Sequence, residues 1–412
     1  MDLAPQMAPL PPVALYVHVP FCVAKCPYCD FVVYAGAEAR GPRARTAQLF
    51  EALAVELALR ADAVDAAFER VGRPPLRSIY FGGGTPSLMP AAQVARLIGM
   101  ARDRFGLAPD AEVTLEANPG PDEIGDMAAF AKAGVNRVSL GAQSFVPGEL
   151  KRLGRRHSPA DIANSVGQAR AAGIQSLNLD LLYDVPGQTE ASWLRSLTEA
   201  LALEPDHLSL YALTLDDPDE EGLTGETDDH LPTPSGARRW REKATADQDD
   251  DRAAGQYEAA SSLLETAGWH HYEISNWARP GHESRHNLAY WLRDPYEGIG
   301  PGAHAFDGLT RRWNVARMEP YLESLAGRQP GFPTGGSDLL DERAAAAERL
   351  ILALRTDAGV PTAWTDDPRF TPDIEWALDA GLLEPFTGPN GSCVRLTVRG
   401  YLLSNELFAR LV

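Results

Sequence analysis

Short apolar runs alternate with longer amphipathic stretches along the first half of the chain. Six runs rich in β-branched and aromatic residues predict strands, and the stretches between them carry apolar residues at helical spacing. The predicted strands cover 13–19, 77–83, 112–118, 136–142, 175–182 and 207–213, and the predicted helices cover 46–60, 90–104, 123–133, 160–172 and 190–203. This alternation predicts an α/β fold of right-handed parallel βα units, either an open doubly wound sheet or a full or partial barrel.

The second half of the chain is less regular. Residues 216–252 carry 13 acidic and 5 basic side chains, a net charge of −8, so we expect a solvated insertion or a loose surface loop, with partner docking as the alternative. A helical pattern resumes at 255–267, and an aromatic-rich and glycine-rich region follows over 269–313. Glycine and proline crowd 327–336 as a predicted linker. The remainder, 339–412, predicts a small separate domain of helix, turn, helix, short strand and helix.

The composition is that of an ordinary folded protein. Of the 412 residues, 44% are hydrophobic and 23% are charged. The net charge of −19 disfavours a protein that tracks nucleic-acid phosphates or binds an anionic membrane. The sequence shows no apolar run of the roughly 20 residues that a membrane span needs, and no secretory signal pattern. Four cysteines in so long a chain make no disulfide scaffold, so we expect a protein of the reducing cytoplasm.

Three of the four cysteines lie within eight residues, as Cys22, Cys26 and Cys29. Three thiols this close cannot all pair with one another, and a redox pair at Cys26 and Cys29 would leave Cys22 unexplained. Zinc held by the three thiolates and His18 is one alternative. The spacing favours the other, an iron–sulfur cluster that keeps one iron open for a non-protein ligand. Cys393 stands alone and is most simply a small buried hydrophobe.

Further chemistry-bearing residues follow the ends of predicted strands. The glycines of FGGGTPS (81–87) let a backbone approach a ligand closely, although a tight turn explains such glycines equally well. Glu116 and Asp180 could accept hydrogen bonds from an amine or from hydroxyl groups, or could serve as a helix cap or an ion pair. Gln143 and Arg155 could supply an amide and a cation, whereas simple solvation is the default for a surface arginine.

Together, the segment Tyr16–Phe21, the Cys-x3-Cys-x2-Cys spacing, GGGTP and these polar positions resemble the radical S-adenosylmethionine superfamily, over residues 13 to about 215. The nearest branch contains oxygen-independent coproporphyrinogen dehydrogenase. The resemblance implies a partial (βα)6 barrel with a small winged-helix-like C-terminal domain. It also implies a [4Fe-4S] cluster held by Cys22, Cys26 and Cys29, whose open iron is chelated by S-adenosylmethionine. By matched position, the residues implied to contact that cofactor are Tyr16, Tyr28, Gly83, Gly84, Thr85, Glu116, Gln143, Arg155 and Asp180.

Departures from the dehydrogenase point to a sister group. The dehydrogenase has a fourth cysteine where this chain has Phe31, and only 21 residues precede Cys22. Both features resemble the HemW family of heme chaperones. The HNLAYW segment (286–291) is similar to the heme motif of that family, and LTVRGYLLSN (396–405) is similar to its C-terminal tail. The resemblance therefore implies heme as a ligand, bound through His286, Asn287, Tyr290 and Trp291.

The heme motif also has a physical basis. If 284–292 is helical, His286 and Tyr290 fall on one face, where an imidazole could ligate iron while Tyr290 and Trp291 pack on the macrocycle. The alternative is a capped helix with buried aromatic residues and a satisfied histidine. His282, His304 and the adjacent GIGPGAHAF loop are rival ligand sources, whereas His270 and His271 are more simply structural.

We therefore expect a cytoplasmic chaperone that delivers heme to an acceptor, for which a membrane-bound respiratory protein is one candidate. The resemblance further implies a homodimer when the cluster is loaded. The alternative is an enzyme that decarboxylates coproporphyrinogen III through a radical. The expected division is a flexible segment at 1–12, the barrel at 13–274 with its acidic insertion at 216–252, the heme-motif region and linker at 275–336, and the C-terminal domain at 337–412.

Overall fold

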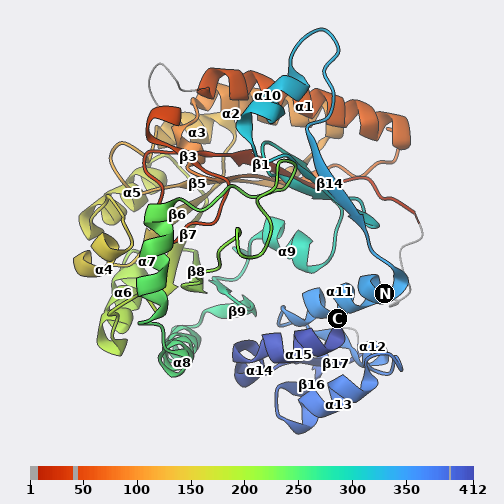
Figure 1. Cartoon of the computed structure of the whole chain (residues 1–412). Coiled ribbons are helices and arrows are strands. Elements are labelled where there is room, and N and C mark those ends of the chain that lie inside the picture. The colour runs from red at the N-terminus through yellow and green to blue at the C-terminus, as the bar shows by residue number, and fades with distance from the viewer. Residues whose placement is uncertain (1–7, 40–44, 389–390) are drawn as a thin grey trace.

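The computed structural model describes residues 8–39, 45–388 and 391–412, and most of them surround one large sheet (Figure 1). Its centre consists of six parallel strands that neighbour one another in chain order. They are β1 (Ala14–Val19), β4 (Leu76–Gly83), β5 (Leu107–Ala117), β6 (Arg137–Gln143), β7 (Ser176–Tyr183) and β8 (His207–Ala212). Every one overlaps a run predicted to be a strand. Because β1 pairs with β11 (Tyr296–Ile299) and not with β8, the barrel is partial, which confirms the predicted architecture.

Helices cover the outer face of these strands. They are α1 (Thr46–Ala67), α2 (Ala91–Phe105), α3 (Met127–Ala133), α4 (Pro147–Arg152), α5 (Pro159–Ala171), α6 (Glu190–Ala202) and α8 (Asp250–Thr266). The alternation of side chains along β1 shows why. Leu15, Val17 and Val19 join the core beneath α1, whereas Tyr16 and His18 point to the concave side and line a cavity there. The site is therefore built from the side chains that each strand points to the concave side of the sheet.

Antiparallel strands widen the sheet at both edges. Beyond β11 lie β12 (His304–Phe306), β13 (Thr310–Asn314) and β14 (Thr334–Leu339). Beyond β8 lie β10 (Asn276–Ala278) and β9 (His270–Glu273). The short helix α9 (Arg285–Trp291) contacts β4, and Figure 1 shows it in the hollow of the curved sheet. The predicted heme motif is thus helical, as expected, and lies inside the barrel.

Two expectations about the second half are wrong. Residues 327–336 are not simply a linker, because β14 begins at Thr334 and runs past the predicted domain boundary as the outermost strand of the large sheet. Residues 216–252 are not simply a loose loop. They contain α7 (Ser235–Thr245), and before it Asp217 and Asp219 accept hydrogen bonds from Arg238. Hydrogen bonds between charged side chains hold this acidic segment in place. Such contacts leave no apolar periodicity in the sequence.

The C-terminal residues form the small α+β unit that the sequence predicts. Its helices are α11 (Glu342–Leu354), α12 (Thr362–Thr365), α13 (Thr371–Asp379), α14 (Val398–Leu402) and α15 (Ser404–Leu411), beside a sheet of β15 (Val360–Pro361), β17 (Gly391–Leu396) and β16 (Leu383–Gly388). Figure 1 places the unit across the sheet from α1 and α2, where α11 contacts α9 and α14 contacts α8. Residues 1–7 of the predicted flexible segment lie outside the described residues.

The remaining elements are short. The cysteine segment carries the two-residue strands β2 (Phe21–Cys22) and β3 (Tyr34–Ala35), and α10 (Met318–Leu325) packs on α1. None of the helices in the described ranges combines the length and the hydropathy needed to cross a membrane.

Candidate functional site

Two cavities lie on the concave side of the barrel. The larger, of about 1030 Å³, lies where the parallel strands end and holds most of the residues singled out from the sequence. Of those residues it is lined by Cys22, Cys26, Tyr28, Cys29, Gly83, Gly84, Glu116, Gln143, Arg155, Asp180 and Asn287. The cavity is also lined by 401–405, so part of the LTVRGYLLSN segment forms its wall from the C-terminal unit. Segments far apart in the chain thus meet around one volume.

The three clustered cysteines are free thiols on the wall of this cavity. Cys22 Sγ lies 3.2 Å from Thr85 Oγ1, and Arg155 Nη1 donates to Cys26 Sγ at 3.4 Å. Across the described ranges, no group of three or more His, Cys, Asp or Glu side chains is arranged around a single ion. The three thiols therefore line one cavity together, with a cation beside Cys26.

His18 does not complete a zinc site. One ring nitrogen, Nδ1, lies 3.0 Å from Tyr16 Oη, and the other, Nε2, lies 2.9 Å from the carbonyl oxygen of Val32. Burial lowers the pKa of His18 to about 4, so the ring is neutral and hydrogen bonded on both sides. The zinc alternative therefore lacks its fourth ligand here.

The donor set fits a bound iron–sulfur group electrostatically. Burial raises the pKa of Cys22 and of Cys29 to about 12, so neither thiol ionises readily by itself. Ligated iron supplies the positive charge that favours thiolate, and Arg155 adds a fixed cation beside Cys26. In the described part of the chain, Arg155 Nε is buried without a hydrogen-bond partner. A donor of this kind suits an anionic group bound in the cavity.

The glycines at the end of β4 bring that strand against the cysteine segment. Gly83 has a positive φ of 110°, and a Cβ there would overlap the His18 ring. A Cβ on Gly84 would lie 2.8 Å from the carbonyl oxygen of Phe21. The amide of Thr85 donates to that same oxygen at 2.8 Å. These glycines therefore fix the cysteine segment beside β4.

Two carboxylates face the cavity from β5 and β7. Glu116 accepts from Tyr80 Oη at 2.8 Å and from the Gly83 amide at 3.0 Å, and burial raises its pKa to about 7. Burial likewise raises the pKa of Asp180, which accepts from Ser139 and Asn178. Acceptors held in this way can bind the amine and hydroxyl groups of a ligand.

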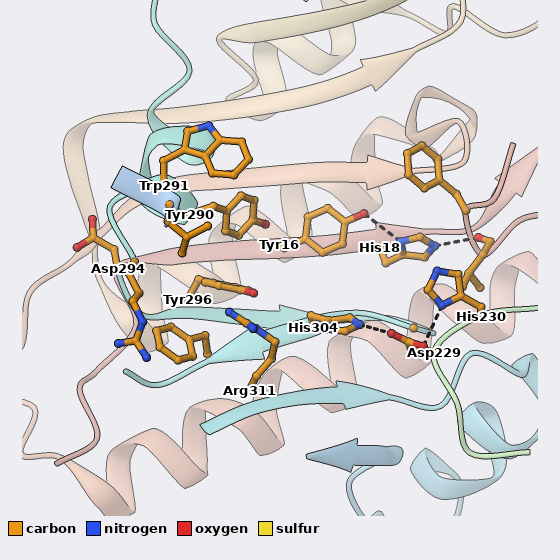
Figure 2. Close-up of a pocket in the computed structure, with 16 residues that line it drawn as sticks. Tyr16, His18, Asp229, His230, Tyr290, Trp291, Asp294, Tyr296, His304 and Arg311 are labelled. Carbon is orange, nitrogen blue, oxygen red and sulfur yellow. Dashed lines mark hydrogen bonds and ion pairs between the residues drawn. The ribbon is translucent and has the colours of Figure 1, made fainter. Parts of the chain in front are cut away.

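The smaller cavity, of about 460 Å³, holds other predicted residues (Figure 2). Tyr16, Tyr290 and Trp291 line it, so Tyr16 belongs here and not to the larger cavity. Phe31, which takes the place of the fourth cysteine, has 60% of its surface exposed and lines both cavities. The side chain of Phe31, directly after the cysteine loop, thus borders both cavities.

His286 faces neither cavity. Its Nδ1 lies 2.9 Å from Ser78 Oγ and its Nε2 lies 2.9 Å from Tyr290 Oη, with 1% of the residue exposed. Burial lowers the pKa of His286 to about 3, so the ring is neutral. It therefore holds Tyr290 in place and offers no free nitrogen to a ligand. Of its predicted rivals, His304 lines the smaller cavity, whereas His282 lies beside Ser176.

Sequence reasoning missed two features of the site, both in the acidic segment. Arg241 on α7 is buried and donates to the backbone oxygens of Pro27, Tyr28 and Cys29. Its helical spacing from the alanines at 237 and 244 could have revealed a buried face. Asp229 and His230 line the smaller cavity, and no pattern in an acidic run marks them.

Comparisons with known proteins find similarity over much of the chain. A family model described as the radical SAM superfamily matches residues 16–200. The protein named heme chaperone HemW from Mycobacterium tuberculosis (strain ATCC 25618 / H37Rv) is 39% identical over 410 residues, covering 99% of this chain and 97% of that protein. The protein of the same name from Escherichia coli (strain K12) is 39% identical over 298 residues, covering 72% and 71%.

Similarity to a solved structure extends along nearly the whole chain. That structure is coproporphyrinogen III oxidase (HemN) from Escherichia coli, described as a radical SAM enzyme, with a TM-score of 0.77. The match covers 98% of this chain and 91% of that one, at 22% sequence identity. At this identity the similarity concerns the fold.

Proposed function

The chain belongs to the HemW family of the radical SAM superfamily, and from this membership we propose that it binds heme and delivers it to an acceptor protein. One observation carries the proposal. The aromatic residues of the HNLAYW segment line a cavity of about 460 Å³ beside the cysteine cavity, and Phe31 borders both. Aromatic walls suit a flat macrocycle, and the volume is within the range of small-molecule sites, about 300–1,000 Å³.

The superfamily implies a [4Fe-4S] cluster and S-adenosylmethionine as resident cofactors. We assign the cluster to Cys22, Cys26 and Cys29. When bound, the cluster would supply an electron and S-adenosylmethionine would supply a sulfonium that can accept it. Residues of the larger cavity would hold that cofactor, namely Tyr28, Gly83, Gly84, Glu116, Gln143, Arg155 and Asp180.

The chain's own residues would orient the bound groups. Arg155 donates to Cys26 and to the Gly141 carbonyl, so one cation ties the cysteine loop to β6. Thr85 contacts Cys22 and also accepts from Asn118 at 2.9 Å, which links the loop to β5. Gln143, the last residue of β6, has φ of 66°, a left-handed conformation, and lines the cavity. Loading of the cluster would therefore stiffen the loop that leads to Phe31.

Delivery of heme tests the proposal. The cluster-loaded chain, immobilised through a tag and loaded with one equivalent of heme, is incubated anaerobically with a heme-free respiratory membrane protein in detergent. We expect heme to transfer from the immobilised chain to that protein faster than it transfers to serum albumin at the same concentration. Equal rates with the two proteins would show passive loss and contradict directed delivery.

The runner-up is oxygen-independent decarboxylation of coproporphyrinogen III. It is favoured by the larger cavity, which retains Glu116, Gln143 and Asp180 in positions suited to S-adenosylmethionine. Phe31 disfavours this decarboxylase activity, because the dehydrogenase group has a cysteine at the position of Phe31. Anaerobic incubation with coproporphyrinogen III, S-adenosylmethionine and dithionite distinguishes the two functions. Stoichiometric protoporphyrinogen would replace the chaperone proposal, whereas unconverted substrate supports it.

Two further features belong to the proposal. We place the chain in the cytoplasm, because three free thiols within eight residues suit a reducing compartment. We also propose that it forms a homodimer when the cluster is loaded, as the family resemblance implies. Light scattering after size exclusion, with and without the reconstituted cluster, tests this. An unchanged mass would count against the linkage.

A further inference from the structure

The smaller cavity contains two histidines joined by one aspartate, which no step above uses. Asp229 accepts a hydrogen bond from His230 Nδ1 at 2.9 Å and another from His304 Nε2 at 2.6 Å. In Figure 2 both rings point at Asp229, at the end of the cavity away from Trp291. The side chains of His230 and His304 keep 30% and 37% of their surface exposed. Both rings are therefore accessible from the cavity.

This bonding leaves one nitrogen of His230 free. A carboxylate only accepts, so Nδ1 of His230 carries a proton, and when the ring is neutral its lone pair lies on Nε2. The hydrogen bond to Asp229 raises the pKa of His230, so iron would compete with a proton for this nitrogen. Within the described ranges, the hydrogen-bond contacts of His230 do not involve Nε2. Histidines that ligate metals usually donate their other ring nitrogen to a carboxylate, which fixes the ring and makes it more basic. His286 does not have this arrangement, whereas His230 and His304 both have it. The remaining nitrogen of His304 is Nδ1, next to the backbone, and its ring stacks on Trp313, whereas the remaining nitrogen of His230 is Nε2, at the far end of the ring.

The backbone holds the pair in place. Gly302, in the loop before β12, has φ of 71°, and a Cβ there would lie 2.8 Å from Val32 Cγ2 and 3.0 Å from the carbonyl oxygen of Asp229. The amide of Ala316 donates to the Asp228 carbonyl at 3.1 Å. Two separate contacts therefore anchor residues 228–230, although they belong to the acidic segment.

The other walls suit a flat, carboxylated ligand. Arg311 pairs with Glu348 at 2.8 Å and keeps a third of its side chain exposed, and in Figure 2 it lies between Tyr296 and His304. Its guanidinium has five N–H donors, so those that Glu348 leaves unused can donate to a ligand carboxylate. The aromatic residues that line the cavity are Tyr16, Phe31, Tyr290, Trp291, Tyr296 and Phe306. The cavity thus combines a nitrogen ligand, a cation and aromatic faces.

We propose that this cavity binds the cargo, an iron tetrapyrrole with carboxylate side chains, and that His230 Nε2 ligates its iron. Asp229 acts as a positioning residue for His230, and His304 holds Asp229 from the other side. The proposal rests on the proposed function and deepens it, because it assigns the iron ligand to the acidic segment and gives His286 the part of supporting Tyr290.

The test compares iron-containing and metal-free ligands. The full cluster-loaded chain and its His230→Ala variant are titrated anaerobically with ferric heme and with protoporphyrin IX. We expect His230→Ala to weaken heme binding about 100-fold and to shift the Soret band, and we expect added imidazole to restore that band. Asp229→Asn should weaken heme binding about tenfold, as is usual for a group that orients a metal ligand. Protoporphyrin IX should bind both variants within twofold of the unaltered chain.

Two controls give the outcomes their meaning. His282→Ala, outside the cavity, should bind heme normally, whereas His286→Ala should weaken heme and protoporphyrin IX equally, since it loosens Tyr290. If the unaltered chain binds heme and His230→Ala retains its affinity and Soret band, the inference is overturned and the proposed function stands. If the unaltered chain does not bind heme saturably, both fail. Retained cluster absorbance checks that each variant is folded.

Discussion

At the scale of single residues, the site depends on the close approach of β4 to β1. Gly83 combines a left-handed backbone with direct packing against the His18 ring. Its amide also donates to Glu116. One residue without a side chain thus connects β1, β4 and β5.

Replacing Gly83 tests this contact. Gly83→Ala should destabilise the chain by about 2–4 kcal/mol, because the new methyl strains the backbone and displaces His18. Chemical denaturation of the cluster-loaded protein measures the change. Gly99→Ala is the matched control. Gly99 lies within α2 with nothing within 4 Å of a Cβ, so alanine there should stabilise by about 0.5–1 kcal/mol. A neutral effect of Gly83→Ala would refute the packing described here.

The cysteines are tested by their iron content. Replacing Cys22, Cys26 or Cys29 singly by alanine should abolish the broad visible absorbance of the reconstituted cluster, because each thiolate would bind one iron of the proposed cluster. Cys393→Ala should leave it unchanged, since Cys393 lies on β17 in the C-terminal sheet. Iron and sulfide analysis decides the outcome. Unaltered iron and sulfide content in the three single variants would contradict the cluster assignment.

At the scale of elements, α7 supports the cysteine loop. Arg241 donates from Nε to the Pro27 carbonyl at 3.3 Å, and from Nη2 to the carbonyls of Tyr28 and Cys29 at 3.3 and 3.1 Å. It also donates to the Asp216 carbonyl, at the start of the acidic segment. A single guanidinium thus satisfies backbone oxygens in the loop that would bind the cluster.

Removal of this side chain should loosen the loop. Arg241→Ala should cost about 2–3 kcal/mol of stability, because it removes a buried guanidinium and leaves the carbonyl oxygens that it serves without their donor. It should also speed the loss of cluster absorbance to an iron chelator. Arg239→Ala, an exposed position on the same helix, is the control and should change neither rate nor stability. Equal chelation rates in the two variants would contradict the role given to Arg241.

The elements also show what sequence can predict. The six parallel strands and their helices follow from apolar periodicity, and the cysteine spacing and GGGTP place the larger cavity. The parts that were missed depend on contacts across the fold. Arg241 meets the cysteine loop more than 200 residues earlier in the chain, and Asp229 meets His304 across 75 positions. Polar side chains in an acidic run leave no periodic signal, so their order appears only in three dimensions.

At the scale of the whole molecule, the C-terminal unit closes the larger cavity. Residues 401–405 line it, and Asp357, which follows α11, bonds to His270 Nε2 at 2.7 Å. Glu283 lies 3.2 Å from His270 Nδ1. Burial opposes protonation of His270, but hydrogen bonds to Asp357 and Glu283 outweigh it and raise its pKa. The contact between the barrel and the C-terminal unit is therefore sensitive to pH.

The direction of this sensitivity follows from the raised pKa. Protonated His270 contributes fully to stability below the pKa of an unfolded histidine, about 6.5. This contribution is lost as the pH rises through the higher pKa of His270 in the folded chain. The melting temperature of the unaltered chain should therefore exceed that of His270→Gln at pH 6, and the difference should shrink by pH 8.5. Thermal unfolding of both proteins across that range provides the comparison. A difference independent of pH would contradict the account.

Binding of heme is the central claim, and an anaerobic titration followed at the Soret band tests it most directly. The cluster-loaded chain is titrated with heme in the presence of S-adenosylmethionine, beside a chain denatured and treated identically. The account predicts a distinct Soret band that saturates at one heme per chain. Absorbance that rises without saturation, as for free heme, would contradict it.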